Sequence, residues 1–307
     1  MDKGVLSLRR LYARRKGGAL FFWLLEMKII AREILADCAG TKIVRLEVVA
    51  PQISRKALAG QFVVLMAAEN GELIPLTVVG GDPQAGTITL ILQEAGLTTR
   101  LLGGLKPGEA LYSLVGPLGH PTEIPAGKRV ILVGGGVGIA EILPVARAMQ
   151  GAGNDVISIL GARNKELLIL EDELKACSGQ LQVTTDDGSS GKKGFVTDVL
   201  RGILAIDHRP STIEFVYAVG PIPMMQRVAQ VTRDFGVKAL VSLNALMVDG
   251  TGMCGCCRVT VAGKTKFSCV DGPDFDAHQV DWDELAKRSK IYVPQEQHIC
   301  LIQPTRL

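Results

Sequence analysis

The pattern of hydrophobic residues changes near the middle of the chain, and this change constrains the fold more than any other feature. Before about residue 125, short β-type runs such as 42–49, 61–66 and 87–92 are separated by turn residues. Short strands in this rhythm, without a long helical period, predict a small antiparallel barrel. After residue 129, apolar strands alternate with helical stretches, which predicts a mostly parallel sheet with helices on both faces.

The strands and helices of the α/β half can be placed along the sequence. Strands are expected at 130–133, 155–160, 182–185 and 215–219, with helices around 144–149 and 223–235. After Val241 the pattern becomes irregular and carries a cluster of cysteines. A chain of 307 residues is long enough for several cores. We therefore expect an extension at 1–26, a barrel at 27–125, an α/β domain at 126–240 and a small module at 241–307.

The charge of the chain excludes several classes of partner. The net charge is only +3, and aromatic residues make up 5% of the chain, too few for base-stacking platforms. Residues 1–28 hold seven basic and two acidic side chains, a local net charge of +5, so the remainder carries −2. The net charge of residues 29–307 therefore gives no reason to expect binding to nucleic acid or anionic lipid.

The N-terminal segment resembles a signal peptide only in part. A basic stretch at 8–16 precedes an apolar run at 19–25, but seven residues fall far short of a membrane span, and no small-x-small cleavage site follows. Met27 then opens a regular segment. We favour a disordered tail upstream of a true start at Met27 over an amphipathic anchor or a cleaved signal. We expect no stable membrane insertion.

The cysteines indicate a reducing compartment. The chain holds seven, an odd number, and four of them crowd into residues 254–269. Such spacing is a poor disulfide framework and is more typical of a metal-binding loop in a cytoplasmic protein. We therefore expect a cytoplasmic location.

A glycine-rich turn closes the first strand of the α/β half. In the run 133–138, glycines allow a tight turn and close approach to a pyrophosphate, which the N–H groups of the following helix favour. The spacing is not strictly G-x-G-x-x-G, and a plain strand-to-helix turn is the alternative. Other candidates lie at two further strand ends, where open α/β sheets bind ligands. The nucleotide candidates are Gly134, Gly135, Gly136, Gly138, Arg163, Asn164, Lys165, Gly220 and Pro221.

Other features of this half leave alternatives open. Arg163 and Lys165 suit a 2′-phosphate, so the choice between NADH and NADPH is undecided. The acidic turn at 186–189 is either a plain loop or the end of a strand that lines the nicotinamide side.

The barrel half carries a weaker pattern. Pro75, Leu76 and Thr77 lie on an expected strand, and Gly96, Thr98 and Thr99 follow about twenty residues later. Small and hydroxyl-bearing residues leave room for a flat ring and offer hydrogen bonds to flavin nitrogens and a pyrophosphate. The alternative is a β-turn followed by a threonine that caps a helix.

The most specific pattern is Asp249-x4-Cys254-x2-Cys257-x11-Cys269, with glycines inside the loop. It matches the plant-type [2Fe–2S] spacing except that Asp249 stands at the first cysteine position. A carboxylate is a harder ligand of the same charge, so the substitution is compatible with iron. A zinc knuckle and a degenerate loop are the alternatives. Cys256 is an alternative thiolate, and the usual spacing favours Cys257.

The order of barrel, nucleotide domain and ferredoxin-like loop resembles the ferredoxin–NADP reductase superfamily. More narrowly, 27–307 is similar to the small subunits of NADH-dependent reduced ferredoxin:NADP oxidoreductases, also called sulfide dehydrogenase beta subunits. Electron-transfer subunits of dihydroorotate dehydrogenase B are related, but they use four cysteines. Asp249 with three cysteines therefore favours the ferredoxin:NADP group.

The resemblance implies a role for each candidate residue. Pro75, Leu76 and Thr77 would contact the flavin ring, Gly96, Thr98 and Thr99 the flavin pyrophosphate, and Gly116 would lie beside the flavin. The glycine-rich turn and the two other strand ends would hold the nicotinamide nucleotide. The arginine that often precedes the flavin-ring proline is Ile74 here, so that contact is not expected.

The resemblance also implies an oxidoreductase subunit with FAD, a [2Fe–2S] cluster and NAD(H) or NADP(H). Hydride would pass between nicotinamide and FAD, and single electrons would pass through the cluster to a partner. That partner would be a larger flavin and [4Fe–4S] subunit similar to the glutamate synthase small chain, and it would reach ferredoxin. A dihydroorotate dehydrogenase B subunit, a sulfide dehydrogenase subunit and a non-catalytic zinc-bearing adaptor are the alternatives.

Overall fold

The computed structural model of the chain describes residues 27–69, 71–206, 213–295 and 298. The predictions for the extension at 1–26 lie outside these residues. Within the described segments, no helix is both long and apolar enough to cross a membrane.

Six antiparallel strands form the first half. They are β1 (Ile29–Cys38), β2 (Thr41–Val49), β3 (Phe62–Met66), β4 (Ile74–Asp82), β5 (Thr87–Gln93) and β6 (Ser113–Leu118), in the order β1-β2-β5-β4-β3-β6. Helix α1 (Pro51–Ser54) follows β2, and α2 (Leu97–Gly104) lies between β5 and β6. Alternate residues such as Val44, Leu46 and Val48 point into a shared core with Leu90. The predicted antiparallel barrel is confirmed.

A seven-stranded sheet forms the second half, in the order β10-β9-β8-β7-β11-β12-β15. Its parallel strands are β7 (Arg129–Gly135), β8 (Asp155–Ala162), β9 (Gln180–Thr185), β10 (Lys192–Lys193), β11 (Ile213–Val219) and β12 (Ala239–Ser242). The intervening helices are α3 (Gly138–Gly151), η2 (Lys165–Leu167), α4 (Glu171–Ala176), α5 (Val196–Ile206) and α6 (Ile222–Asp234). Every strand and helix predicted here is present.

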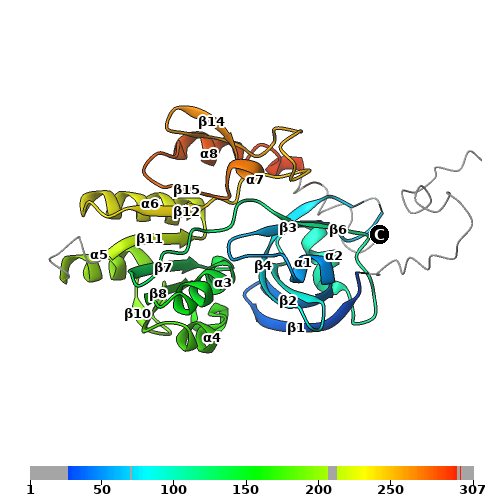
Figure 1. Ribbon diagram of the computed structural model, residues 1–307, viewed down its shortest axis with the longest axis horizontal. Helices are drawn as coiled ribbons and strands as arrows, with labels where there is room; N and C mark the ends of the chain where they lie inside the picture. The colour runs from blue at the N-terminus through cyan, green and yellow to red at the C-terminus, as the bar shows by residue number, and fades with distance from the viewer. Residues whose placement is uncertain (1–26, 70, 207–212, 296–297, 299–307) are drawn as a thin grey trace, which may run out of the picture.

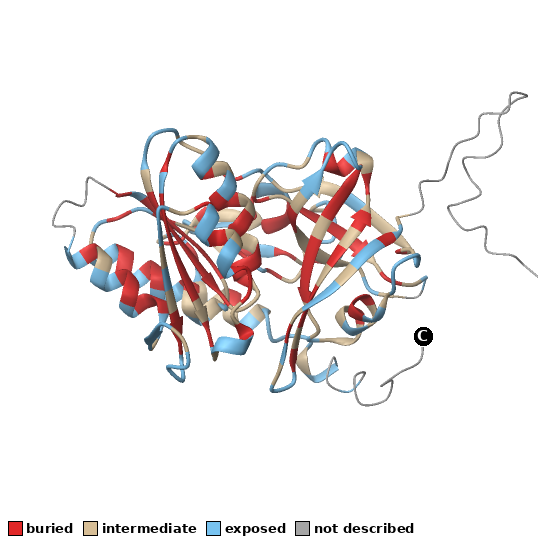
Figure 2. Cartoon of the chain, turned by 90° about the horizontal axis from the view of Figure 1, so that it is seen from below, coloured by how far each residue is buried: buried red, intermediate tan, exposed pale blue. Residues whose placement is uncertain are grey.

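Helices cover both faces of this sheet (Figure 1). Ile131 and Val133 of β7 pack into the core beneath α5 and α6, whereas Val130 and Leu132 pack into the core beneath α3. Because successive residues of a strand point to opposite faces, a strand buried on both sides reads as a continuous apolar run. Figure 2 shows the central strands buried along most of their length.

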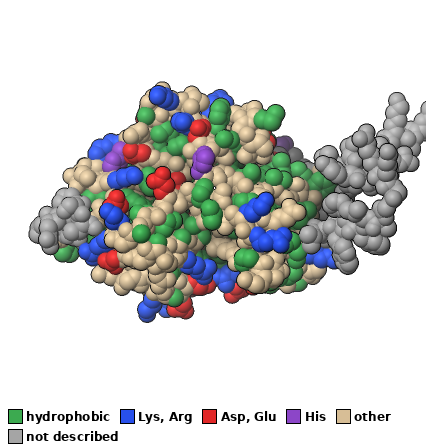
Figure 3. Space-filling model, viewed as in Figure 1, with side chains coloured by type: hydrophobic (Ala, Val, Ile, Leu, Met, Phe, Trp, Pro, Cys, Tyr) green, Lys and Arg blue, Asp and Glu red, His purple; other side chains and the backbone are tan. Residues whose placement is uncertain are grey.

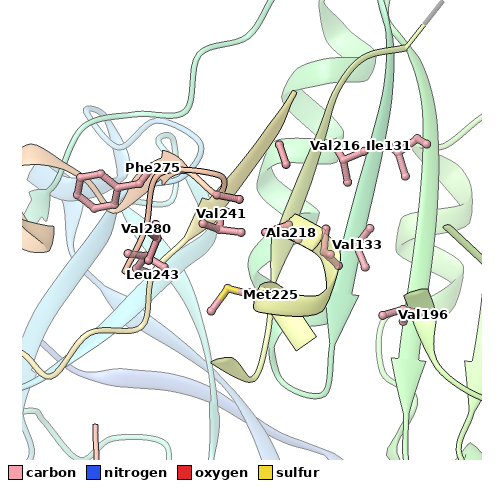
Figure 4. Close-up of a cluster of buried hydrophobic side chains, with 14 of the residues drawn as sticks. Ile131, Val133, Val196, Val216, Ala218, Met225, Val241, Leu243, Phe275 and Val280 are labelled. Atoms are coloured by element: carbon pink, nitrogen blue, oxygen red, sulfur yellow. The ribbon is translucent and has the colours of Figure 1, made fainter. Parts of the chain in front are cut away.

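The C-terminal segment adds β13 (Arg258–Val261), β14 (Lys264–Phe267), α7 (Ser268–Asp271), β15 (Asp274–Asp276) and α8 (Trp282–Arg288). Strands β13 and β14 form a separate two-stranded sheet. Strand β15 instead pairs antiparallel with β12, with Ser242 opposite Asp274. The core beneath α6 continues into this segment through Leu243, Phe275 and Val280 (Figure 4). The segment is therefore built onto the edge of the nucleotide-domain sheet.

Polar contacts join the barrel to the α/β half. Arg45 of β2 pairs with Glu173 of α4 at 2.7 Å, and helix α3 packs against β4. On the face seen in Figure 3, basic and acidic side chains are intermixed among hydrophobic ones. The Arg45–Glu173 ion pair and the packing of α3 against β4 thus join the two halves along one interface.

Candidate cofactor sites

A cavity of about 660 Å³ lies at the carboxyl ends of β7, β8 and β9, against the barrel. The barrel supplies Thr41, Ile43 and Gln93, which the sequence did not point to. The α/β half supplies Gly135, Gly136, Val137, Gly161, Ala162, Arg163, Leu167, Thr184, Asp186, Phe195, Val196, Thr197, Pro221, Pro223, Met224 and Arg227. Its place matches the ligand position of open α/β sheets, and its volume suits a nucleotide.

The four predicted glycines divide into two roles. Gly135 and Gly136 line the cavity, and Gly136 has φ +57°, which favours glycine. Gly134 and Gly138 are needed for packing. A Cβ on Gly138 would overlap the carbonyl of Val219, and one on Gly134 would lie 2.9 Å from the Cα of Ile139. The turn is thus tight enough to bring the start of α3 close to the strand ends.

The predicted cluster 163–165 does not act as one unit. Arg163 lines the cavity, and its guanidinium donates a hydrogen bond to the Thr41 hydroxyl across the domain seam. Asn164 instead caps η2, accepting from the N–H of Leu167 at 3.1 Å. Lys165 is exposed and does not line the cavity. Only Arg163 of the three therefore faces the nucleotide space.

The remaining strand ends also differ in their roles. Pro221 lines the cavity, whereas Gly220 packs against Met224, since a Cβ there would lie 2.7 Å from its methyl carbon. Asp186 lines the cavity, and Asp187 turns away to bind Ser189. Phe195, 65% exposed, adds an aromatic face. No sequence signal pointed to Phe195, because it lies in the short connection between β10 and α5, ten residues after the end of β9.

The flavin-ring candidates occupy the open part of β4. Pro75, Leu76 and Thr77 are half-buried, although Val78 and Val79 of the same strand are buried. Ile74 packs on the barrel core, where an arginine would not. The Thr77 hydroxyl donates a 3.1 Å hydrogen bond to Glu141 in the first turn of α3. An incompletely covered apolar strip with one hydroxyl suits a flat heteroaromatic ring.

The second barrel motif forms the start of α2. Thr99 closes a local cap, because its hydroxyl accepts from the N–H groups of Ala95 and Gly96 at 2.9 Å each. Thr98 is buried, and a Cβ on Gly96 would meet nothing within 4 Å. The N-terminal end of α2 therefore borders open space at Gly96, and the N–H groups that begin a helix favour an anion there. The Thr99 hydroxyl is already engaged in the local cap and is therefore not free to bind that anion. Gly116 packs against Val63, which a Cβ there would approach to 2.7 Å.

The cysteine loop places its predicted ligands in two pairs. The Cys257 sulfur lies 3.1 Å from that of Cys269, and both residues are buried. Asp249 accepts from the N–H groups of Thr251 at 2.8 Å and Cys254 at 3.0 Å. The loop between them turns through Gly250, Gly252 and Gly255, all at positive φ.

Two pairs fit a two-iron cluster better than a single ion. Among the described residues, no three His, Cys, Asp or Glu side chains converge as they would around one metal ion. Two thiolates on one tetrahedral metal lie ~3.8 Å apart at the usual metal–sulfur length, so the Cys257 and Cys269 sulfurs, 3.1 Å apart, would separate slightly to hold one iron together. Carboxylate oxygens carry further lone pairs, so the hydrogen bonds to Asp249 leave it able to ligate.

The pKa shifts of the loop residues differ between the same two pairs. Hydrogen bonds from backbone N–H groups, chiefly that of Thr251, hold the pKa of Asp249 below its usual range. Burial and the neighbouring Cys257 raise the pKa of Cys269 to about 12. Cys256 does not join the buried pair, and its N–H donates to the Cys254 sulfur at 3.5 Å. The geometry therefore favours Cys257 over Cys256 as the second thiolate.

Two protein families match segments of the chain. Residues 132–230 match the oxidoreductase NAD-binding domain, and residues 244–281 match the iron–sulfur cluster binding domain of dihydroorotate dehydrogenase B. The first segment contains most of the cavity, and the second contains the four predicted ligands. The expected oxidoreductase class and the expected NAD(H) and iron–sulfur cofactors are confirmed.

Similar proteins extend the match over most of the chain. A Thermotoga maritima protein named as a homolog of the dihydroorotate dehydrogenase B (NAD(+)) electron transfer subunit is 49% identical over 246 residues, 80% of this chain and 86% of the relative. A chain in the solved structure of the NADH-dependent reduced ferredoxin-NADP oxidoreductase is 45% identical, with a TM-score of 0.82 over 89% of this chain and 96% of that one. The structure of ferredoxin-NADP+ reductase from Plasmodium falciparum, at 14% identity and a TM-score of 0.57, covers 69% of this chain and 91% of that one and shares the fold.

These matches confirm the resemblance inferred from the motifs, including FAD as the cofactor expected of this fold. They also confirm that the protein acts as one subunit of a complex. The chain belongs to the family of dihydroorotate dehydrogenase B electron-transfer subunits and their homologues, within the ferredoxin–NADP reductase superfamily.

Proposed function

We propose that this chain is the small subunit of an NADH-dependent reduced ferredoxin:NADP oxidoreductase. Its FAD would exchange hydride with NAD(H), and a [2Fe–2S] cluster would pass single electrons onward. The observation that carries the proposal is Asp249, which stands with three cysteines where the dihydroorotate dehydrogenase subunits are expected to have four. The high coverage of the ferredoxin-NADP oxidoreductase chain supports it.

Each cofactor has proposed ligands. The nucleotide would occupy the cavity lined by Gly135, Gly136, Arg163 and Pro221. The flavin ring would lie on 75–77, and its pyrophosphate at the first turn of α2. The cluster ligands would be Asp249, Cys254, Cys257 and Cys269. We also propose the domain limits 27–125, 126–240 and 241–307, with β12 crossing the last boundary.

The cavity supports NADH over NADPH. The Asp186 carboxylate lines it, and would repel a 2′-phosphate. Lys165, which suited that phosphate in the sequence, does not line the cavity. Arg163 and Arg227 also line the cavity, but Arg163 is held by the Thr41 hydroxyl and Arg227 donates to Gln230 at 3.2 Å, so the proposal takes the Asp186 carboxylate as the group that selects the nucleotide.

The partner would be a larger flavin and [4Fe–4S] subunit similar to the glutamate synthase small chain. It would bind NADP(H) and ferredoxin and would receive electrons from the cluster. A cytoplasmic location fits thiolate ligands, which oxidising compartments do not preserve.

An anaerobic absorbance spectrum of the purified chain tests the proposal. Flavin and [2Fe–2S] bands should both be present, and both should bleach when NADH is added. A colourless protein that binds zinc would overturn the electron-transfer function and leave the adaptor alternative.

A dihydroorotate dehydrogenase B subunit is the second candidate, favoured by the name of the Thermotoga relative. The native complex distinguishes the two. Reduction of NAD+ with dihydroorotate as the electron donor, giving orotate, in the purified complex would support this candidate, whereas NADPH-linked ferredoxin turnover would support the first.

A further inference from the structure

Two arginines hold the turn between the second and third proposed cluster ligands. Arg258 Nη1 donates a 3.1 Å hydrogen bond to the Gly255 carbonyl, and Arg288 Nη2 donates a 3.0 Å hydrogen bond to the Cys256 carbonyl. Arg258 begins β13, whereas Arg288 lies in the last turn of α8, 32 positions after Cys256. Two separate elements therefore fix two consecutive peptide groups of the cysteine loop.

The hydrogen bond to Gly255 also orients an N–H group toward a proposed ligand. The C=O and N–H of a trans peptide point in opposite directions. Because Arg258 holds the Gly255 carbonyl on one side, the Cys256 N–H of the same peptide points to the other, where it donates to the Cys254 sulfur at 3.5 Å. Hydrogen bonds to the sulfurs of an iron–sulfur cluster help to set its reduction potential. Arg258 thus acts on Cys254 through the intervening peptide.

Both arginines also bring positive charge to this turn. Neither forms an ion pair with a carboxylate of the described residues, whereas Lys266, another cation of the same module, pairs with Asp271 at 3.2 Å. Arg288 is half-buried, so water screens its charge less than that of an exposed side chain. A guanidinium stays protonated in proteins. The loop therefore has two permanent positive charges within hydrogen-bond distance of its backbone.

The proposed ligand set makes the charge of these arginines significant. One carboxylate and three thiolates carry more negative charge than the ferric [2Fe–2S] core carries positive charge, and each electron that enters adds to the excess. A nearby cation attracts the more negative, reduced form more strongly than the oxidised form. Cations and N–H donors at this turn therefore act in the same direction, because both favour reduction.

We propose that Arg258 and Arg288 are positioning residues that raise the reduction potential of the cluster. Arg258 acts through the peptide that donates to Cys254, and Arg288 acts through its charge at the Cys256 carbonyl. Both would favour the movement of electrons from the flavin to the cluster. The inference rests on the proposed cluster ligands, and it goes beyond them because it assigns a role to two residues that are not ligands.

A redox titration of the holoprotein, followed by the EPR signal of the reduced cluster, measures this potential directly. At the ambient potential where half of the wild-type cluster is reduced, Arg258→Gln and Arg288→Gln should each lower the ratio of reduced to oxidised cluster about threefold. The double variant should lower the ratio about tenfold, which corresponds to about 59 mV for a one-electron couple.

Two further variants separate a specific effect from a general one. Lys287→Gln is the matched control, because it removes an exposed cation from the same turn of α8, and its ratio should match that of wild type. Arg288→Lys keeps the charge and should recover at least half of the loss seen in Arg288→Gln. Iron and sulfide content per chain shows which variants still hold a full cluster.

The outcomes separate this inference from the proposed function. A wild type that holds no [2Fe–2S] cluster would overturn the proposed function. A wild type with a cluster whose potential is unchanged in both glutamine variants would overturn only this inference, as would a shift in Lys287→Gln as large as that in Arg288→Gln. Absence of recovery in Arg288→Lys would contradict the role of its charge. If Arg288→Gln loses its cluster, Arg258→Gln decides, because Arg258 is exposed and its replacement leaves no buried group unpaired.

Discussion

The Tyr217 hydroxyl, in the middle of β11, donates a 3.0 Å hydrogen bond to Asp274 on β15. Asp274 also accepts from Thr122, in the segment that leaves the barrel, at 2.5 Å. Tyr217 is buried and Asp274 is half-buried, and desolvation raises the pKa of each. One carboxyl therefore ties together strands from the nucleotide half, the cluster-bearing segment and the connection to the barrel.

Removing the donor of the Tyr217–Asp274 hydrogen bond should destabilise the protein less than removing its acceptor. Tyr217→Phe removes one donor and should cost about 1–2 kcal/mol, whereas Asp274→Ala leaves two buried hydroxyls without an acceptor and should cost about 3 kcal/mol. Urea unfolding measures both. Equal stability of Asp274→Ala and wild type would show that the network contributes nothing to the fold.

Asp249→Ala should remove or damage the cluster and leave the flavin bound, because the cluster loses one of four proposed ligands. Iron content and the visible spectrum measure this, and Asp249→Cys should retain a cluster. Asp283→Ala, an exposed acid at the start of α8, is the control. An unchanged cluster spectrum in Asp249→Ala would show that Asp249 is not a ligand.

Asp186→Ser should improve binding of NADPH about tenfold relative to NADH, because it removes a negative charge from the cavity. Asp187→Ser is a matched control, since its side chain binds Ser189 instead. Titration of flavin reduction with each nucleotide measures the ratio. If the two variants give the same ratio, the charge of Asp186 does not select the nucleotide.

Gly138→Ala should destabilise the protein by about 2 kcal/mol or more, because its Cβ would overlap the carbonyl of Val219. Gly151→Ala, at the other end of the same helix, meets nothing within 4 Å and should stabilise by about 0.5 kcal/mol. Thermal unfolding of both variants checks this. A tolerated Gly138→Ala would mean that the helix has room to shift.

Glu141 should make stability depend on pH. Its pKa rises on folding from the ordinary 4.5 to about 7, so folding favours the protonated form. This contribution is complete below about pH 4.5 and is lost as the pH rises through 7, so Glu141→Gln should gain about 2 kcal/mol relative to wild type between pH 5 and 8. Unfolding at both pH values measures it, with Glu214→Gln expected to track wild type.

The sequence was most informative where the signal is local. The strands at 130–133 and 155–160 and the pairing of closely spaced cysteines depend on periodicity and spacing, which a chain displays directly. Glu141 carried no such signal, because an acid in the first turn of a helix is ordinary for dipole reasons. Its contact with Thr77 exists only after the barrel packs against α3.

The same limit applies to the cavity and the buried network. Thr41 and Gln93 line the nucleotide space from barrel strands that are forty or more residues from the glycine-rich turn. Asp274 lies in the irregular C-terminal part of the sequence and becomes the acceptor for Tyr217 and Thr122 only when β15 joins the sheet. Contacts of this kind follow from topology, which periodicity does not specify.

The pairing of β15 with β12 has a mechanical consequence. The hydrogen-bond ladder and the shared core at Leu243, Phe275 and Val280 couple the segment that carries the cysteine loop to the nucleotide-binding sheet, and the same core includes Phe62 and Val64 of the barrel. A rotation of one half against the other would therefore have to break part of the core beneath the cysteine loop. The proposed cluster site is thus a wedge that fixes the two halves relative to each other.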